Sequence, residues 1–144
     1  MNPRTNLPNM NIKNMEKSTF VIDVDGTICN APANPDGSYD YSNAVPMPRV
    51  ISKIQRLFKE GHTVILCTAR GMRTYKGDTE MIERHVVPVL KEWLERYQVP
   101  YHELRVGKPW GPNVYYVDDR CLSPYAFAYQ DSYDGIMSSN TLTL

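Results

Sequence analysis

One stretch constrains the fold more than any other part of this 144-residue chain: residues 19–27, Thr-Phe-Val-Ile-Asp-Val-Asp-Gly-Thr. An apolar, β-branched run of strand length ends in two carboxylates, Asp23 and Asp25, followed by Gly26. Residues two apart in a strand point to the same side, so both carboxylates can face the space beyond the strand end. Two carboxylates held together are costly unless a cation or a shared proton relieves their repulsion. The pattern indicates a metal site, an acid–base pair, or both; an Asp-rich surface turn is the alternative.

Three later apolar runs also end in polar residues. Strands are expected over residues 62–67, 100–106 and 114–117, and the segments that follow them are Thr68-Ala69-Arg70-Gly71, Gly107-Lys108-Pro109 and Asp118-Asp119-Arg120. Helical spacing of apolar residues predicts a helix that Pro46 and Pro48 open and Gly61 stops, and another that starts at Asp78 or Thr79 and is kinked at Pro88. Alternating strands and helices imply a mostly parallel sheet with right-handed crossovers. Because ligands bind such sheets beyond the carboxyl ends of the strands, one edge is expected to collect Asp23, Asp25, Thr68, Lys108, Asp118 and Asp119.

Length and charge limit the organisation of the chain. We expect a poorly ordered leader over residues 1–17, one domain over 18–131 and a loosely ordered tail over 132–144. Sixteen basic and sixteen acidic residues give no overall attraction to nucleic acid or membrane, and no apolar run is long enough to span a bilayer. Three cysteines match neither a zinc spacing nor an even disulfide set, so a reduced, cytoplasmic protein is expected.

The segment at about 28–41 carries the turn-forming residues Pro35, Asp36 and Gly37. Proline presets φ, aspartate hydrogen-bonds back to the chain, and glycine accepts a positive φ. A short hairpin directly after the first strand is therefore expected, with an ordinary surface loop as the alternative.

Taken together, Asp-Val-Asp-Gly-Thr, Thr-Ala-Arg-Gly, Gly-Lys-Pro and Asp-Asp resemble the four motifs of the haloacid dehalogenase (HAD) phosphohydrolase superfamily. The resemblance extends from Thr19 to Phe127. It implies a single Rossmann-like, three-layer α/β domain with a mostly parallel sheet and a hairpin flap over the site. The segments between the motifs are too short for a cap domain. The chain is most similar to small capless phosphatases of capsule and other surface-polysaccharide synthesis.

The resemblance also implies roles for individual residues. Asp23 is the nucleophile that forms an aspartyl-phosphate, and Asp25 protonates the leaving oxygen and then activates water. Mg²⁺ is the expected cofactor, held by Asp23, the backbone carbonyl of Asp25, and Asp119, with Asp118 as neighbour; the roles of this last pair can be exchanged. Four residues are expected to bind the substrate phosphate: Thr68, Ala69, Arg70 and Lys108.

The substrate and the oligomeric state stay open at this point. A sugar phosphate or related polyol phosphate is the expected substrate. A polynucleotide 3′-phosphatase is the alternative, supported by Arg70, Arg73, Lys76 and Arg120, although zero net charge counts against nucleic acid. Outside hydrolysis, a metal-dependent sugar-nucleotide transferase and a non-catalytic binding module are the other possibilities.

Overall fold

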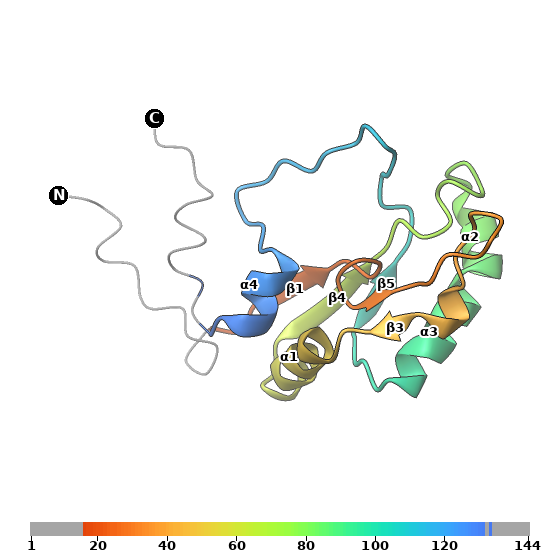
Figure 1. Ribbon diagram of the computed structural model, residues 1–144. Coiled ribbons are helices and arrows are strands. Elements are labelled where there is room, and N and C mark those ends of the chain that lie inside the picture. The colour runs from red at the N-terminus through yellow and green to blue at the C-terminus, as the bar shows by residue number, and fades with distance from the viewer. Residues whose placement is uncertain (1–15, 132, 134–144) are drawn as a thin grey trace.

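The computed structural model of the protein describes residues 16–131 and 133. The expected leader and tail therefore lie outside the described residues, except for residues 16, 17 and 133. Three parallel strands form the main sheet in the order β1 (Thr19–Ile22), β4 (Thr63–Cys67) and β5 (Glu103–Arg105) (Figure 1). The α/β class, the parallel sheet and the first three predicted strands are confirmed.

The alternation of side chains explains which face of the sheet forms the core. Ile22 and its partner Leu66 are buried, and they belong to one apolar cluster with Val64 on the same face. Val21 points to the other face and is 61% exposed. Burying the apolar side chains on one face supplies most of the favourable free energy of such a layer.

Three helices follow the predicted apolar spacing, and two of them cover that buried face. Helix α1 spans Pro48–Lys59, α2 spans Thr79–His85 and α3 spans Val87–Arg96. Ile54 of α1 and Trp93 of α3 are fully buried in the same cluster as the strands, so both helices lie on one side of the sheet (Figure 1). Asp78 caps α2 by accepting hydrogen bonds from the N–H groups of residues 80 and 81.

The predicted kink at Pro88 is confirmed as a break, because α2 ends at His85 and α3 begins at Val87. Proline has no backbone N–H and is tolerated only in the first turn of a helix, so the chain begins a new helix there. The helical spacing of apolar residues also predicts Phe58 and Val89 to be core residues, and this is wrong: Phe58 is 36% and Val89 38% exposed. Phe58 lies in the last turn of α1, where its ring stacks on the His102 ring with centroids 4.5 Å apart.

The predicted hairpin is present as a two-stranded antiparallel unit. Strand β2 (Cys29–Asn30) pairs with β3 (Val45–Pro46), and an isolated bridge joins Ala33 to Tyr39. The tip closes where the N–H of Asn34 donates to Ser38 O at 2.7 Å. A short 3-10 helix, η3 (Tyr41–Asn43), returns the chain toward α1. No additional domain is inserted in the described chain.

The fourth predicted strand, residues 114–117, is not formed. Tyr115 is 81% and Val117 96% exposed, and among the described residues β1 pairs with β4 alone. A β-branched, aromatic run becomes a strand only when a neighbouring strand satisfies its backbone groups, and this run follows the turn-forming residues Gly111 and Pro112. Residues 106–123 instead make a long arc on the side of the sheet away from α1 (Figure 1).

The chain then returns to the core through α4 (Pro124–Tyr129), capped by the Ser123 hydroxyl, which accepts from the N–H of Ala126. Phe127 of α4 packs edge-on against Phe20, as does Tyr133, the described residue of the expected tail. None of the helices in the described part of the chain is long and apolar enough to cross a membrane.

Candidate active site

The two carboxylates that follow β1 keep the alternation of the strand. Ile22 and Val24 are buried, whereas Asp23 and Asp25 are partly exposed. Val24 O then accepts hydrogen bonds from the N–H groups of Thr27 and Ile28 at 3.1 and 2.8 Å, which turns the chain sharply. Gly26 adopts φ +79°, a conformation that other residues adopt at a cost. The turn leaves both carboxylates at the carboxyl end of β1.

Arg70 clamps Asp25 from the segment that follows β4. Its Nε donates to Asp25 Oδ2 at 3.1 Å and its Nη2 donates to Asp25 Oδ1 at 3.0 Å, a bidentate pair. The Arg70 side chain is 1% exposed and that of Asp25 36%. Arg70 Nη1 is buried and has no hydrogen-bond partner among the described residues. The pair fixes the orientation of the Asp25 carboxylate.

Two residues from the hairpin unit complete this clamp. The ring of Tyr41 lies over the Arg70 guanidinium, 4.2 Å from its carbon to the ring centroid. The Cys29 thiol lies 3.7 Å from Asp25 Oδ1 and 3.8 Å from Arg70 Nη2. Burial, reinforced by the neighbouring Asp25 charge, raises the pKa of Cys29 to about 12. The thiol is therefore neutral in this cluster at neutral pH.

Lys108 is the cation that lies beside Asp23. It follows β5, and its Nζ lies 3.5 Å from Asp23 Oδ1 and 4.5 Å from the centre of the Tyr116 ring. Both side chains are partly exposed, 23% for Lys108 and 36% for Asp23, so solvent screens this pair and it contributes about 1 kcal/mol or less to stability. Its importance lies in placing a cation beside the first carboxylate.

Thr68 connects the segments that carry these cations. It is fully buried, and its Oγ1 accepts from the backbone N–H of Arg70 at 3.0 Å. Its own N–H donates to Arg105 O at 2.9 Å, and its carbonyl accepts from the N–H of Lys108 at 3.3 Å. The hydroxyl therefore accepts a local hydrogen bond that holds the turn carrying Arg70. Ala69, also expected at the site, is partly buried in the turn between Thr68 and Arg70.

The second acidic pair does not join the first. Asp118 and Asp119 lie exposed in the 106–123 arc. The Arg120 N–H donates to Asp118 Oδ1 at 3.0 Å and holds the pKa of that carboxyl below its usual value. Within residues 16–131 and 133, no three His, Cys, Asp or Glu side chains come together as a metal site. Carboxylate oxygens suit Mg²⁺ chemically, but the described arrangement does not assemble a full ligand set.

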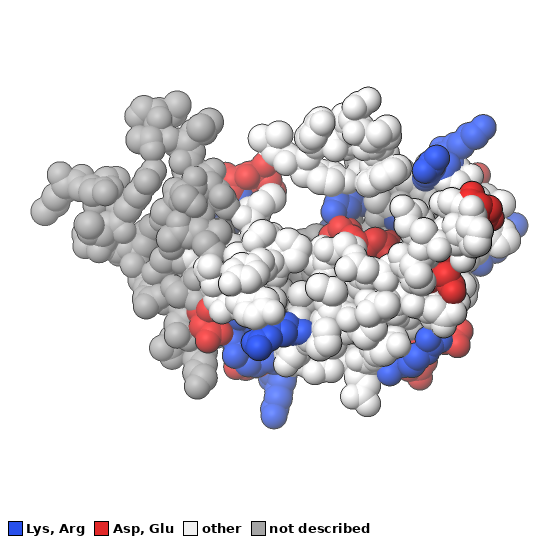
Figure 2. Space-filling model, viewed as in Figure 1, with Lys and Arg blue, Asp and Glu red and all other residues white. Residues whose placement is uncertain are grey.

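Sequence reasoning missed Cys29, Tyr41 and Tyr116 as members of this site. Cys29 and Tyr41 were assigned only to the flap segment, and Tyr116 to the fourth strand. An aromatic ring next to a predicted arginine or lysine cation is the signal that could have suggested Tyr41 and Tyr116. No sequence signal identifies Cys29. In the surface view, acidic and basic side chains meet in the hollow beneath the 106–123 arc (Figure 2).

A cavity of about 180 Å³ adjoins Arg70, and its wall is formed by Tyr41, by the loop that follows Arg70 and by the region where α2 meets α3. Tyr41, Tyr75 and His85 contribute rings to its wall, and the last two are stacked with centroids 5.6 Å apart. The cavity therefore has aromatic side chains in its wall beside Arg70.

Comparison with solved structures finds a protein similar to this chain. The chain is 35% identical to a structural-genomics target from Vibrio cholerae whose crystal structure superposes with a TM-score of 0.73, over 85% of this chain and 95% of that one. No protein-family model and no curated protein matches the chain. Identity at this level over most of both chains shows common descent as well as a common fold. The chain therefore belongs to the same protein family as this Vibrio cholerae structure.

Proposed function

We propose that the protein is a phosphomonoester hydrolase that works through an aspartyl-phosphate on Asp23. One observation carries the proposal: each carboxylate at the end of β1 is paired with a cation that follows another strand of the same sheet, Arg70 after β4 and Lys108 after β5. Asp23 faces Lys108 at 3.5 Å, and Asp25 is clamped by Arg70 at 3.0 and 3.1 Å. Two carboxylates and two cations at one sheet edge suit a reaction that moves a phosphoryl group.

The proposed chemistry has two steps. A carboxylate oxygen of Asp23 attacks phosphorus and the ester P–O bond breaks. Asp25 has to enter this step as the neutral carboxylic acid, and it gives its proton to the leaving oxygen and becomes the carboxylate. Water then attacks the phosphorus of the aspartyl-phosphate while Asp25 accepts its proton, and inorganic phosphate leaves. Lys108 offsets the negative charge of Asp23 and of the phosphoryl oxygens. Uncatalysed phosphate monoester hydrolysis is so slow that the enzyme has to lower the barrier by roughly 20 kcal/mol or more.

Mg²⁺ is part of the proposal. Asp23, the Asp25 carbonyl and Asp119 or Asp118 would hold it, and it would let carboxylates approach an anionic phosphate. This requires the acidic pair of the 106–123 arc to come to the end of β1. The metal requirement is therefore a separate claim from the hydrolase class, and it has its own test.

We further propose a small sugar phosphate or polyol phosphate as the substrate, in capsule or surface-polysaccharide synthesis. The cavity beside Arg70 supports a small substrate rather than a polymer, since its volume is only about 180 Å³. A formal charge of zero argues against tracking a nucleic-acid backbone. A cytoplasmic setting is proposed with it, since neither Cys29 nor Cys67 forms a disulfide.

Hydrolysis of p-nitrophenyl phosphate by purified protein tests the proposal. Activity is expected with Mg²⁺, loss with EDTA, recovery on adding Mg²⁺ back, and none for Asp23→Asn. Undiminished hydrolysis in EDTA would contradict the metal requirement but would still be consistent with a phosphomonoester hydrolase. If the protein hydrolysed neither p-nitrophenyl phosphate nor any sugar phosphate, with or without Mg²⁺, the proposal that it is a phosphomonoester hydrolase would be contradicted.

A further inference from the structure

A second cavity lies between α1 and α4, outside the candidate active site. Its volume is about 410 Å³, and its wall is made by residues of α1 and of the α4 end of the chain. Its lining residues are Pro48, Arg49, Ser52, Lys53, Arg56, Ala128 and Asp131. None of them contacts Asp23, Asp25 or their cations in the described structure, so this groove needs its own explanation.

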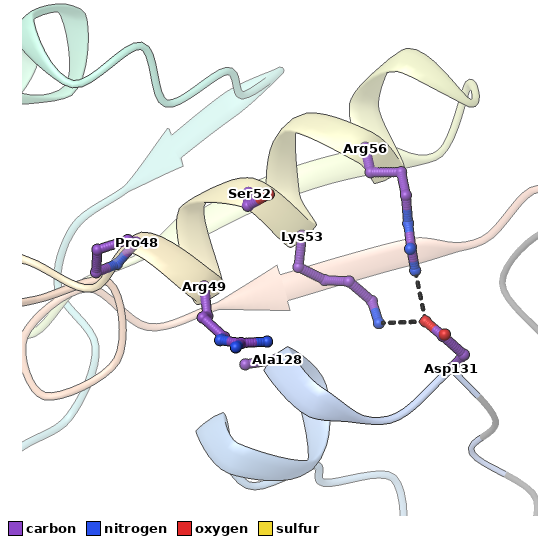
Figure 3. Close-up of a pocket in the computed structure, with 7 residues that line it drawn as sticks. All are labelled: Pro48, Arg49, Ser52, Lys53, Arg56, Ala128 and Asp131. Carbon is purple, nitrogen blue, oxygen red and sulfur yellow. Dashed lines mark hydrogen bonds and ion pairs between the residues drawn. The ribbon is translucent and has the colours of Figure 1, made fainter.

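The groove carries three cations and one carboxylate. Arg49, Lys53 and Arg56 are spaced by four and three residues on α1, which places them on one face of the helix. Figure 3 shows all three projecting from α1 toward the side where Ala128 and Asp131 lie. Lys53 Nζ and Arg56 Nη2 both reach Asp131 Oδ1, at 3.3 and 2.7 Å. A single carboxylate oxygen therefore serves two of the cations.

Two of the three cations, Arg49 and Arg56, retain donors that the described protein does not satisfy. Arg56 Nε is buried without a hydrogen-bond partner among the described residues. The Arg49 guanidinium lies 4.7 Å from the centre of the Tyr129 ring and makes no ion pair in the described part of the chain. Lys53 is only 5% exposed, and burial lowers its pKa even though Asp131 acts in the opposite direction. Lys53 Nζ also donates to the carbonyl of Gln130 at 2.8 Å, so this buried ammonium has hydrogen-bond acceptors, but it shares its single compensating carboxylate with Arg56.

We propose that the groove between α1 and α4 binds a small, multiply charged anion of the phosphate-ester or diphosphate class. Arg49, Lys53 and Arg56 supply its donors, and guanidinium forks match the spacing of phosphate oxygens. Asp131 occupies the position of one ligand oxygen in the described structure. Its side chain is 66% exposed, so the carboxylate can swing out and acts as an internal competitor for the site.

The first experiment locates binding. Inorganic pyrophosphate is titrated into the full-length protein at constant ionic strength, while NMR follows the Nε–H signals of Arg49, Arg56 and Arg70. Saturable shifts are expected at Arg49 and Arg56, with a dissociation constant distinct from that of any shift at Arg70. Shifts confined to Arg70 and the end of β1, or linear shifts at every exposed arginine, overturn the proposal.

Three variants separate an anion site from a merely basic surface. Lys53→Met keeps most of the side-chain volume but removes the buried donor, so affinity should fall about tenfold or more. Asp131→Asn removes the competing charge and should increase the affinity for pyrophosphate about threefold or more. If Asp131 were only a structural contact, its loss should lower that affinity instead. Arg49→Gln changes an exposed residue, tests the third donor without disturbing the core, and should weaken binding.

Lys91→Met is the matched control, because Lys91 is an exposed lysine on α3. It should leave the pyrophosphate affinity unchanged. Equal losses of affinity in Lys53→Met and Lys91→Met overturn the proposal. Unchanged affinity in both Arg49→Gln and Asp131→Asn also overturns it, and this second comparison holds even if Lys53→Met fails to fold. All these readouts are independent of phosphatase activity.

Discussion

At the scale of single residues, Arg70 has the most specific position in the candidate active site. Its guanidinium is buried, holds Asp25 with two hydrogen bonds and lies under the Tyr41 ring. The sequence indicated Arg70 as a ligand for the substrate phosphate. The described contacts make it a residue that positions Asp25, with Nη1 left over for an acceptor.

This position predicts the behaviour of Arg70→Lys. Lysine keeps the charge but cannot form the bidentate fork, so Asp25 loses its fixed orientation. We expect kcat for p-nitrophenyl phosphate to fall by about 10²-fold, since small misplacements of a reacting group have effects of that size. Arg73→Lys is the control, because Arg73 is exposed in the same loop. Equal kcat values in the two variants would show that the clamp has no part in the reaction.

Cys29 provides a pH prediction at the same scale. Its pKa rises from 9.0 to about 12 in the folded protein, so the unfolded chain loses the thiol proton at lower pH than the folded one. Stability from this group is present below pH 9.0 and is lost as the pH rises toward about 12. Urea unfolding midpoints of wild type should therefore fall more steeply over this window than those of Cys29→Ala. Parallel pH profiles would contradict the buried, neutral thiol.

At the scale of elements, Gly71 joins the site loop to α2 and α3. It adopts φ +86°, and an added Cβ would lie 2.8 Å from Val86 Cγ2 and 3.1 Å from Ile82 Cγ1. The loop that carries Arg70 therefore packs directly on the junction of these helices. Gly37 at the hairpin tip has nearly the same φ, +87°, but nothing lies within 4 Å of its added Cβ.

These two glycines form a matched pair for measurement. Gly37→Ala should lower the free energy of unfolding by about 1 kcal/mol, the cost of a left-handed alanine. Gly71→Ala carries the same backbone cost plus overpacking, and should lose about 1–3 kcal/mol more. Urea unfolding of wild type and both variants measures these differences in the free energy of unfolding. Equal losses would mean that Val86 and Ile82 move aside without cost.

The elements also show how far sequence reasoning reaches. Four elements were predictable from the sequence: strands β1, β4 and β5 and helix α1. Each is a periodic apolar run that ends at a turn or cap residue, such as Gly61 after α1. Residues 114–117 have the same local composition as a strand, yet they lie exposed in the arc. Local pattern cannot decide whether a run finds a pairing partner, because that depends on contacts distant in the sequence.

At the scale of the whole molecule, the sheet edge joins the residues that were predicted from three of the four motifs. Asp23, Asp25, Arg70 and Lys108 meet there because parallel strands end at one edge. Asp118 and Asp119 do not, since the predicted fourth strand that was to deliver them is absent. The ring contacts of Tyr41 and Tyr116 could not be predicted, because they depend on how the hairpin unit and the arc fold back over the edge.

The magnesium proposal makes a prediction about the arc. If Asp118 or Asp119 is a ligand, adding Mg²⁺ with orthovanadate should slow amide hydrogen exchange in residues 114–121, because an exposed segment becomes ordered at the end of β1. The double variant Asp118→Asn, Asp119→Asn should show no such protection. Mg²⁺-dependent activity without added protection would place the remaining ligands elsewhere.

The most direct test of the central claim separates Asp23 from Asp25 by rapid-quench kinetics with p-nitrophenyl phosphate. Nitrophenolate leaves readily without protonation, so Asp25→Asn should still transfer the phosphoryl group to Asp23 but should hydrolyse the phosphoenzyme slowly. Asp23→Asn should be inactive, and circular dichroism of both variants checks that they fold. We expect a burst of nitrophenolate, stoichiometric with enzyme, for Asp25→Asn and no burst for Asp23→Asn. A burst from folded Asp23→Asn, or full turnover of a sugar phosphate by Asp25→Asn, would contradict it.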